Sequence, residues 1–358
     1  MSFLRQNVLN SAGYVPGEQP TDPSVIKLNT NENPYPPSPR VMEAIRAVTA
    51  EQLRRYPSPT GLAFREAAAK VHGLAPDWIL PFNGGDELLS VAIRAAAGEN
   101  HTVAYLEPSY SLYPVLTEMQ GAQALEFQYD IAGTAWSLPE GLETLEREEA
   151  AVLLIVNPNA PSGHLETLAR LEEIATGFGG LLVIDEAYVD FAEHSALGLV
   201  KDHENVLILR TMSKGYGLAG LRFGYGIAQP SLLRQIEKVR DSYPVDAISI
   251  AAATAAMLDQ EYAKSTWEKV KLERTRLAAA LGKLGFTMPK SQSNFLLATV
   301  PAGVYARELY EKLKARGILV RWWDLPRIAD KVRITVGTPE QNDRLLAALA
   351  AILTPRRP

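Results

Sequence analysis

The sequence lacks cysteine, long hydrophobic runs and an excess of basic residues, and each absence excludes a class of protein. Without cysteine the chain has no disulfide framework, thiolate nucleophile or cysteine metal site. No apolar run approaches the roughly 20 residues of a membrane span, and residues 1–7 lack the apolar core of a signal peptide. The net charge is -5 and the basic residues are scattered, so there is no electrostatic footprint for nucleic acid or an anionic membrane. We therefore expect a cytoplasmic protein whose ligands are small molecules.

Two kinds of catalytic motif are missing as well. The five histidines show no metal-ligand spacing and the motif H-E-x-x-H does not occur, so we expect no metal site. The nucleophile motif G-x-S-x-G does not occur either. Serine-hydrolase chemistry therefore has no support.

The length and the hydrophobic content predict two domains preceded by an N-terminal arm. The chain has 358 residues, of which 47% are hydrophobic, and this is enough for a sizeable core. Residues 1–35 are rich in Pro, Asn, Gly and Ser, so they cannot form a regular helix or a central strand. Because they also contain Tyr14 and Ile26, we expect an ordered arm that packs on the small domain or on a partner subunit.

Short apolar strands alternate with helices over residues 36–240. Strands that are apolar throughout and separated by helices predict an α/β domain with a mainly parallel sheet that is covered on both faces. The predicted strands are 79–83, 102–106, 151–156, 181–184, 206–209 and 222–227, and the predicted helices are 39–48, 62–71, 86–97, 112–119 and 165–176.

The pattern changes after residue 240. Residues 246–258 and 261–284 have long helical patterns, and Pro244 marks the boundary before them. Short strands and helices follow, which predicts a smaller α+β domain over residues 241–358. The elements expected there are strands 294–297, 318–320 and 332–336, a helix over 305–316 and a final helix from 340.

Polar side chains stand where several of the predicted parallel strands end. They are Asn157, Asp185, Ser213 and Lys214. Ligands of such sheets bind outside the carboxyl ends of the strands, so we expect these side chains to share one crevice. The carboxylate of Asp185 would leave a buried strand there, and it needs a cationic partner because an unpaired buried charge costs several kcal/mol.

Lys214 has unusual neighbours for a lysine. It lies between an apolar strand and a glycine turn, beside Ser213 and ahead of Arg222. Such a lysine could hold an aldehyde cofactor as a Schiff base, while the hydroxyl and the guanidinium hold its phosphate. Residues 84–87, Gly-Gly-Asp-Glu, open a predicted helix and add free backbone N–H groups suited to a dianion.

A dinucleotide site is the alternative at the same stretch. Residues 215–220 match G-x-G-x-x-G after a predicted strand. However, residues 222–227 have the pattern of another strand instead of a helix, and the motif comes late in the chain, whereas it belongs in the first βα turn. The pattern therefore disfavours a dinucleotide.

Taken together, these motifs resemble the pyridoxal-phosphate-dependent aminotransferases of class I/II, which have fold type I. The resemblance runs from Tyr14 to the last helix, and within the family the chain is most similar to members that act on histidinol phosphate. It implies a large domain with a mainly parallel sheet of the seven-stranded type, a smaller α+β domain and a homodimer. Its carriers are residues 28–35 (L-N-T-N-E-N-P-Y), 55–57 (R-Y-P), 84–87 (G-G-D-E), 108–110 (P-S-Y), 157–163 (N-P-N-A-P-S-G), 185–188 (D-E-A-Y), 211–214 (T-M-S-K), 217–222 (G-L-A-G-L-R) and 333–337 (R-I-T-V-G).

The resemblance assigns the cofactor, pyridoxal 5'-phosphate, to named residues. Lys214 would form the Schiff base, and Asp185 would pair with the pyridinium nitrogen. The partner subunit would supply Tyr56 to the phosphate. The remaining implied contacts are Tyr188 and Asn157 to the phenolic oxygen, Tyr110 to the ring face, and Gly85, Asp86, Thr211, Ser213 and Arg222 around the phosphate.

The resemblance also implies the substrates and the proton transfers. Arg333 would clamp a carboxylate or a phosphate ester, with Arg321, Tyr14 and Asn33 as further contacts. The substrate amine would displace Lys214, which then moves the Cα proton, and 2-oxoglutarate would accept the amino group. Ala160, Ser162, Gly85 and Ser58 depart from the commonest family pattern. Aromatic amino-acid transamination and threonine-phosphate decarboxylation therefore stay open as alternatives to histidinol phosphate.

Overall fold

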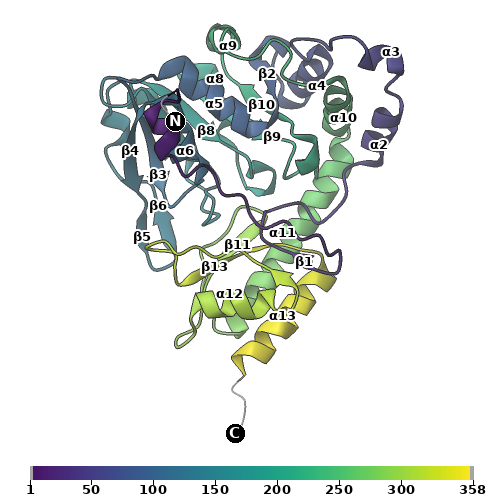
Figure 1. Cartoon of the computed structure of the whole chain (residues 1–358), viewed down its shortest axis with the longest axis vertical. Helices are drawn as coiled ribbons and strands as arrows, with labels where there is room; N and C mark the ends of the chain where they lie inside the picture. The colour runs from purple at the N-terminus through teal and green to yellow at the C-terminus, as the bar shows by residue number, and fades with distance from the viewer. Residues whose placement is uncertain (1–2, 355–358) are drawn as a thin grey trace.

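The structure is a computed structural model that describes residues 3–354. The ends of the predicted arm (1–2) and of the predicted small domain (355–358) lie outside the described residues. A seven-stranded sheet in the order β2-β10-β9-β8-β7-β3-β4 fills the upper part of Figure 1. Its strands are β2 (Ile79–Phe82), β3 (Thr102–Glu107), β4 (Gln123–Gln128), β7 (Val152–Val156), β8 (Leu181–Asp185), β9 (Val206–Thr211) and β10 (Gly224–Ile227).

The strand pairing confirms the predicted fold class. Only β10 runs antiparallel, to β9 and to β2, while the pairs from β9 to β4 are parallel. The strand β10 lies where the sequence predicts a strand after the glycine motif, so a helix does not follow that motif as a dinucleotide site would require.

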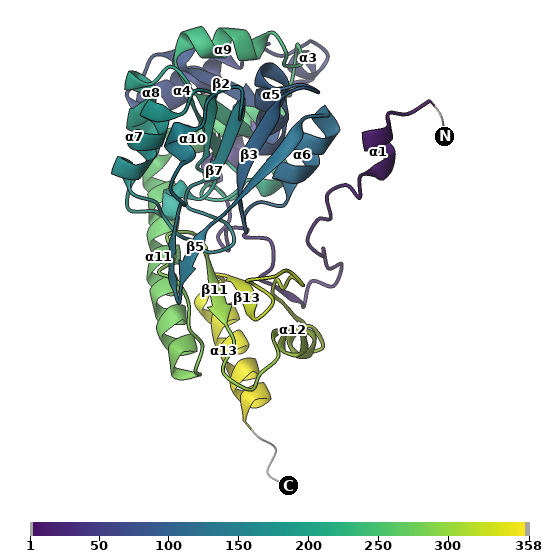
Figure 2. The ribbon, with the colours of Figure 1, turned by 90° about the vertical axis from the view of Figure 1, so that its left-hand side faces the viewer.

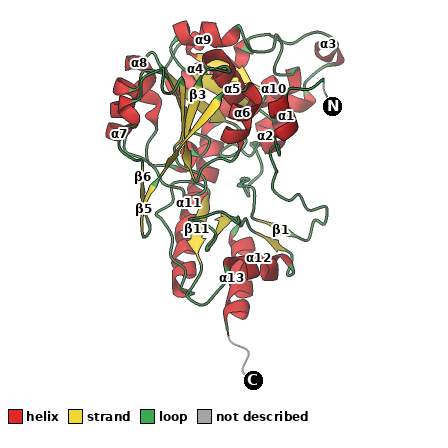
Figure 3. Ribbon diagram, turned by 60° about the vertical axis from the view of Figure 1, so that its left-hand side comes forward, coloured by secondary structure: helices red, strands yellow, loops and turns green. Residues whose placement is uncertain are grey.

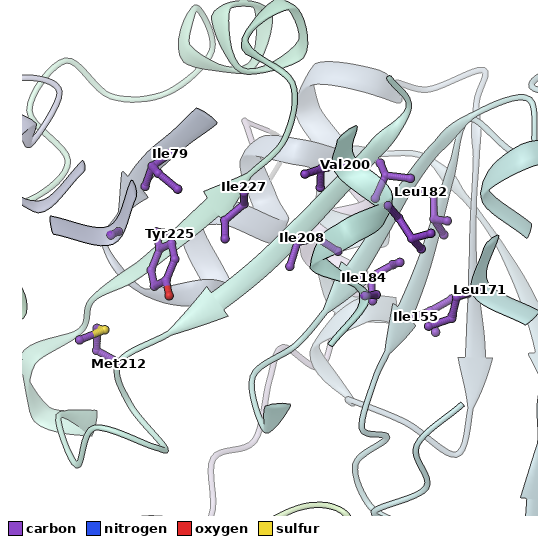
Figure 4. Close-up of a cluster of buried hydrophobic side chains, with 14 of the residues drawn as sticks. Ile79, Ile155, Leu171, Leu182, Ile184, Val200, Ile208, Met212, Tyr225 and Ile227 are labelled. Atoms are coloured by element: carbon purple, nitrogen blue, oxygen red, sulfur yellow. The ribbon is translucent and has the colours of Figure 1, made fainter. Parts of the chain in front are cut away.

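Helices cover both faces of the sheet, and alternate strand residues pack against the two layers. Leu182 and Ile184 belong to one hydrophobic cluster, whereas Leu181 and Val183 belong to the other. Figure 4 shows the first of these clusters. The helices of this region are α2 (Pro39–Arg46), α3 (Ala50–Leu53), α4 (Leu62–His72), α5 (Gly84–Ala96), α6 (Leu112–Gln120), α7 (Leu168–Gly177), α8 (Leu199–Asp202), α9 (Pro230–Glu237) and α10 (Ala247–Leu258), with short 3₁₀ turns η1 (Pro76–Trp78), η2 (Leu142–Thr144), η3 (Val189–Phe191), η4 (Ala196–Gly198) and η5 (Ala219–Leu221).

Helix caps fix several starts that the sequence predicts. The hydroxyl of Ser38 accepts a hydrogen bond from the Arg40 N–H, and proline opens the first turn of α2. Asp246 caps α10 in the same way by accepting from the Ser249 N–H. These side chains satisfy N–H groups that have no partner inside the helix.

A second unit lies below the sheet in Figure 2, and the long helix α11 (Gln260–Lys283) runs from the region of the sheet into it. Its core packs α11 against β11 (Phe295–Thr299), β13 (Lys331–Thr335), α12 (Ala306–Lys314) and α13 (Pro339–Leu353). The strands β11 and β13 pair antiparallel, and β12 (Ile318–Leu319) pairs parallel with β1 (Ile26–Lys27) from the N-terminal segment. Within the described residues, no helix has the length and the apolar character to cross a membrane.

The N-terminal segment contains a short helix, which corrects the expectation that residues 1–35 hold none. The helix α1 (Gln6–Asn10) forms because these five residues contain neither proline nor glycine. It contacts α6, where Arg5 and Asn7 donate to the carbonyl groups of Met119 and Glu118, both at 2.6 Å. Figure 3 shows the segment then crossing toward β1 without regular structure.

Four strands have no clear sequence signal, and the two-residue β1 is one of them. The edge strand β4 is largely exposed and mixes polar with apolar residues, so it lacks the continuous apolar run of the inner strands. The strands β5 (Asp130–Ala132) and β6 (Ala135–Ser137) form a small hairpin of three residues each. Strands this short give no periodicity to read.

Candidate active site

A cavity of about 220 Å³ opens at the carboxyl ends of β7, β8 and β9 and reaches the second unit. It brings together most of the residues that the sequence singles out. Those lining it are Tyr14, Gly85, Asp86, Tyr110, Asp185, Tyr188, Thr211, Ser213, Lys214, Arg222, Arg321 and Arg333. The shared crevice expected at the strand ends is therefore present.

Lys214 follows β9 and precedes Gly215, a position where only glycine fits. A Cβ atom at Gly215 would lie 2.0 Å from the carboxylate of Asp190. The Lys214 Nζ donates to the carbonyl oxygen of Thr30 at 3.2 Å. Burial, and then the charge of Arg333, lower the pKa of Lys214 to about 8.

This lowered pKa predicts a reactive amine in the protein free of cofactor. The neutral amine is the nucleophile, so labelling of Lys214 by a small aldehyde with a reductant should rise about tenfold per pH unit up to about pH 8 and then level off. An ordinary lysine would keep rising toward about pH 10.4. Mass spectrometry of the labelled peptide measures this, with the exposed Lys290 as the internal control. Identical profiles for the two lysines would contradict the assignment.

Asp185 ends β8 as a buried carboxylate, 5% exposed. Its two oxygens accept from the Ala187 N–H at 3.0 Å and from the Tyr113 hydroxyl at 3.1 Å. Burial raises the pKa of Asp185 to about 6. Among the described residues no Lys, Arg or His forms an ion pair with it, so the chain itself does not supply the cationic partner that the sequence calls for.

Two side chains beside this carboxylate present unused polar atoms. The amide oxygen of Asn157 accepts from the Glu166 N–H at 2.8 Å, while its Nδ2 is buried without a partner among the described residues. The hydroxyl of Tyr188 accepts from Asn31 Nδ2 at 3.0 Å, and burial raises the pKa of this phenol. Asn157 does not line the cavity, but it follows β7 at the same sheet edge.

The start of α5 reaches the cavity through Gly85 and Asp86. Asn83 gives this helix no side-chain cap, and the N–H groups of an uncapped helix start suit an anion. Arg222 holds a left-handed backbone, with φ of 56°, and its guanidinium donates to the Asp86 carboxylate at 3.2 Å. Ser213 lies nearby in the cavity wall, where its N–H donates to the Thr211 hydroxyl at 3.1 Å.

Two tyrosines close one side of the cavity. The hydroxyl of Tyr110 donates to Asp86 at 3.1 Å, and burial raises the pKa of Tyr110. Tyr14 of the N-terminal segment meets the ring of Tyr110 edge-on, with centroids 6.1 Å apart. The arm thus forms part of the cavity wall.

Two arginines, Arg333 and Arg321, also line the cavity. Arg333 and Arg321 face each other across a backbone bridge, with N–H···O distances of 2.8 and 2.9 Å. The Arg333 guanidinium lies 5.2 Å from the ring centroid of Phe295 and 5.0 Å from that of Trp323, and it donates to the Asn29 carbonyl at 3.0 Å. Burial, and then the charge of Arg321, lower the pKa of Arg333 to about 10, while Tyr188 acts in the opposite direction.

Besides Asn157, two further sequence-predicted residues, Asn33 and Tyr56, do not line the cavity. The Asn33 amide donates to the Gly215 carbonyl at 2.9 Å and accepts from the Tyr35 N–H at 3.0 Å, so both its groups hold the chain beside Lys214. Tyr56 is 81% exposed and stacks on Tyr243 with centroids 4.5 Å apart.

Three residues at the site, Asn31, Tyr113 and Trp323, are not among those that the sequence predicts to have a role. Asn31 binds Tyr188, Tyr113 binds Asp185, and Trp323 lies between the two arginines. Asn31 belongs to the N-E-N-P stretch that carries the resemblance, and this is the one signal that could have found it. Tyr113 and Trp323 reach the site through contacts that no local pattern reveals.

Comparison with known proteins places this geometry in a family. Residues 23–349 match the family described as aminotransferase class I and II. Histidinol-phosphate aminotransferase 1 of Nostoc sp. is 50% identical over 99% of each chain, and the histidinol-phosphate aminotransferase of Geobacter sp. is 45% identical over 98% of each. The crystal structure of histidinol-phosphate aminotransferase from Sinorhizobium meliloti, in complex with pyridoxal-5'-phosphate, has a TM-score of 0.83 and 28% identity, covering 92% of this chain and 90% of that one. The chain belongs to the class I and II aminotransferase family.

Proposed function

We propose that this aminotransferase binds pyridoxal 5'-phosphate in the cavity beside Lys214. Three observations fit this cofactor. Asp185 is a buried carboxylate that pairs with no cation of residues 3–354, which suits a pyridinium nitrogen. The Nδ2 of Asn157 is a buried donor that finds no acceptor in the same part of the chain, which suits a phenolic oxygen. The uncapped start of α5 beside Arg222 suits a phosphate.

Each residue of the cavity then has a defined role. When bound, the cofactor supplies an aldehyde for the amine and a ring that accepts electrons from the substrate carbon. Lys214 would hold that aldehyde, and Asp185 would keep the ring nitrogen protonated. Tyr188 and Asn157 would bind the phenolic oxygen, and Tyr110 would contact the ring. Gly85, Asp86, Thr211, Ser213 and Arg222 would hold the phosphate.

Lys214 is also the proposed base. Once a substrate amine had replaced it, the free Nζ would take up the proton that the substrate Cα releases, hold it and give it back in the transfer. A pKa of about 8 suits both the uptake and the release of the proton, because such an amine accepts and releases protons near neutral pH.

The proposed substrates are histidinol phosphate and 2-oxoglutarate, which give imidazole acetol phosphate and L-glutamate in histidine biosynthesis. The observation that carries this proposal is the near full-length identity of 50% to a histidinol-phosphate aminotransferase. The pair Arg333 and Arg321 supports it, since two guanidinium groups suit either a phosphate ester or a carboxylate. Arg333 Nε is buried without a partner among the described residues, so it is available to such an anion.

Half-reactions with separate amine donors test the substrate. The purified enzyme loaded with cofactor receives histidinol phosphate, phenylalanine or threonine phosphate alone, and the visible absorbance of the cofactor reports its conversion. We expect histidinol phosphate to convert it at least about tenfold more efficiently than phenylalanine, since one well-placed anion contact gives about this discrimination. Conversion by phenylalanine alone would point to an aromatic aminotransferase, and release of CO₂ from threonine phosphate would point to a decarboxylase.

The proposed active unit is a homodimer. Tyr56 carries the argument, since its ring is exposed and does not line the cavity of its own chain, as expected if it serves the partner's phosphate site. We likewise propose an arm over 1–35, a large domain over 36–240 and a small domain over 241–358. The helix α10 of the last range also packs against α2 and α4 of the large domain, and α11 contacts η3. Placement in the cytoplasm stays a prediction.

A further inference from the structure

Asn31 forms a hydrogen-bonded bridge between Tyr188 and strand β13. It is buried, and its backbone is left-handed, with φ of 57°. Its Nδ2 lies 3.0 Å from the Tyr188 hydroxyl, and its Oδ1 lies 3.1 Å from the hydroxyl of Thr335. The Asn294 side chain donates to the Asn31 carbonyl at 2.9 Å and holds the residue from the other side.

The Thr335 hydroxyl fixes which way the Asn31 amide points. This hydroxyl accepts from the Asn31 backbone N–H at 3.0 Å, so its own hydrogen is free to donate. The acceptor is the amide oxygen of Asn31 at 3.1 Å. With the amide oxygen on this donor, the amide nitrogen faces Tyr188, and since an NH₂ group only donates, the Tyr188 oxygen is the acceptor.

A phenol that accepts this hydrogen bond keeps its own hydrogen for another acceptor. Among the described residues the Tyr188 hydroxyl makes no second hydrogen bond. Burial raises the pKa of Tyr188, so the phenol stays protonated and can donate. Its ring is held by edge-on contact with Phe295, whose centroid is 5.0 Å away, and it therefore cannot turn freely to another partner.

We propose that Asn31 and Thr335 are positioning residues that direct the Tyr188 hydroxyl to donate to the phenolic oxygen of the cofactor. This inference rests on the proposed cofactor site. Thr335 and Arg333 are alternate residues of β13 and share one side of the strand, so the strand that carries the substrate clamp also orients the cofactor's tyrosine. Neither positioning residue touches the reacting atoms.

Asn31→Asp tests whether the Tyr188 hydroxyl accepts from residue 31 and so keeps its hydrogen for the cofactor. Aspartate keeps nearly the same shape, tolerates the left-handed backbone and still accepts from Thr335, but its second oxygen would accept the Tyr188 hydrogen. The phenolic oxygen of the cofactor would lose its donor. The pH midpoint of the visible absorbance change of the bound cofactor should then rise by about one unit or more, a tenfold shift in the protonation equilibrium, and approach that of Tyr188→Phe.

Two substitutions of Thr335 separate orientation from packing. Thr335→Val keeps the shape without the hydroxyl, and it should raise the midpoint by less than Asn31→Asp because the Asn31 amide can still adopt either orientation. Thr335→Ser keeps the hydroxyl and should match the parent. Thermal unfolding of the variants without cofactor checks that each is folded.

The outcomes distinguish this proposal from the cofactor assignment. A parent enzyme with no visible absorbance after incubation with pyridoxal 5'-phosphate would overturn the proposed function itself. If the parent titrates normally and folded Asn31→Asp shows the same midpoint or a lower one, the cofactor site stands and the positioning role is wrong. The positioning role would also be wrong if the pH midpoint rose as much in Thr335→Ser as in Thr335→Val, since a change in packing would then explain both rises.

Discussion

Lys214→Ala is expected to lower turnover by more than about 1,000-fold, the largest loss of any single change in the cavity. The substitution removes both the amine that holds the cofactor aldehyde and the base that moves the Cα proton. No other lysine lines the cavity within the described part of the chain. Steady-state transamination measures the loss, and the absorbance of the bound cofactor reports the missing covalent link.

The same variant should still bind the cofactor. The start of α5, Arg222 and Asp185 are unchanged by it, and they supply the anion and ring contacts. Lys214→Arg is the matched control, because it keeps a positive charge in the cavity but cannot form a Schiff base. It should be as inactive as the alanine variant, and a small primary amine added to Lys214→Ala should restore part of the activity. Transamination by Lys214→Arg at a tenth of the parent rate or more would refute the proposed role of this lysine.

The large sheet could be predicted because its inner strands are short, apolar throughout and separated by helices. In the structure β7 and β8 are fully buried on both faces, which is the condition that produces such runs. The strand β4 could not be predicted, since an exposed edge strand pairs through its backbone and leaves its side chains unconstrained. The helix α1 was missed because the composition of the whole arm hid five residues that can form a helix.

Part of the cavity could also be predicted from the pattern of buried strands. Asp185 and Lys214 stand where buried strands end, and the parallel arrangement brings those ends to one edge. Arg333 could not be placed there from strand patterns alone, because it comes from a different unit and enters through contacts between distant segments. The resemblance singled it out, and it also singled out Asn33, whose side chain holds the turn after Lys214 without lining the cavity.

Asp185→Asn is expected to lower turnover by about 100-fold to 1,000-fold. The carboxylate accepts from two donors, the Ala187 N–H and the Tyr113 hydroxyl, and no cation in the described part of the chain pairs with it. A pyridinium nitrogen would therefore find there a negative charge whose orientation is already fixed, and such fixed charges in buried sites contribute several kcal/mol to a transition state. The asparagine amide would remove that charge, and its NH₂ group would face either the Ala187 N–H or the Tyr113 hydroxyl, both of which donate to the carboxylate in the parent. Steady-state rates with the amine donor at saturation measure the change.

Tyr113→Phe is the matched control for Asp185→Asn, because it removes one of the two donors and leaves the charge. We expect it to lower turnover by no more than about tenfold, the effect of one hydrogen bond. Unfolding without cofactor shows whether Asp185→Asn still folds. Burial raises the pKa of Asp185 to about 6, so its ionisation lowers the stability of the parent as pH rises from about 4 to about 6, and the difference in stability between the parent and the asparagine variant should shift toward the variant over that range. If a stable Asp185→Asn enzyme kept full turnover, the buried carboxylate would have no part in activating the ring. Its burial without a protein cation would then need another cause.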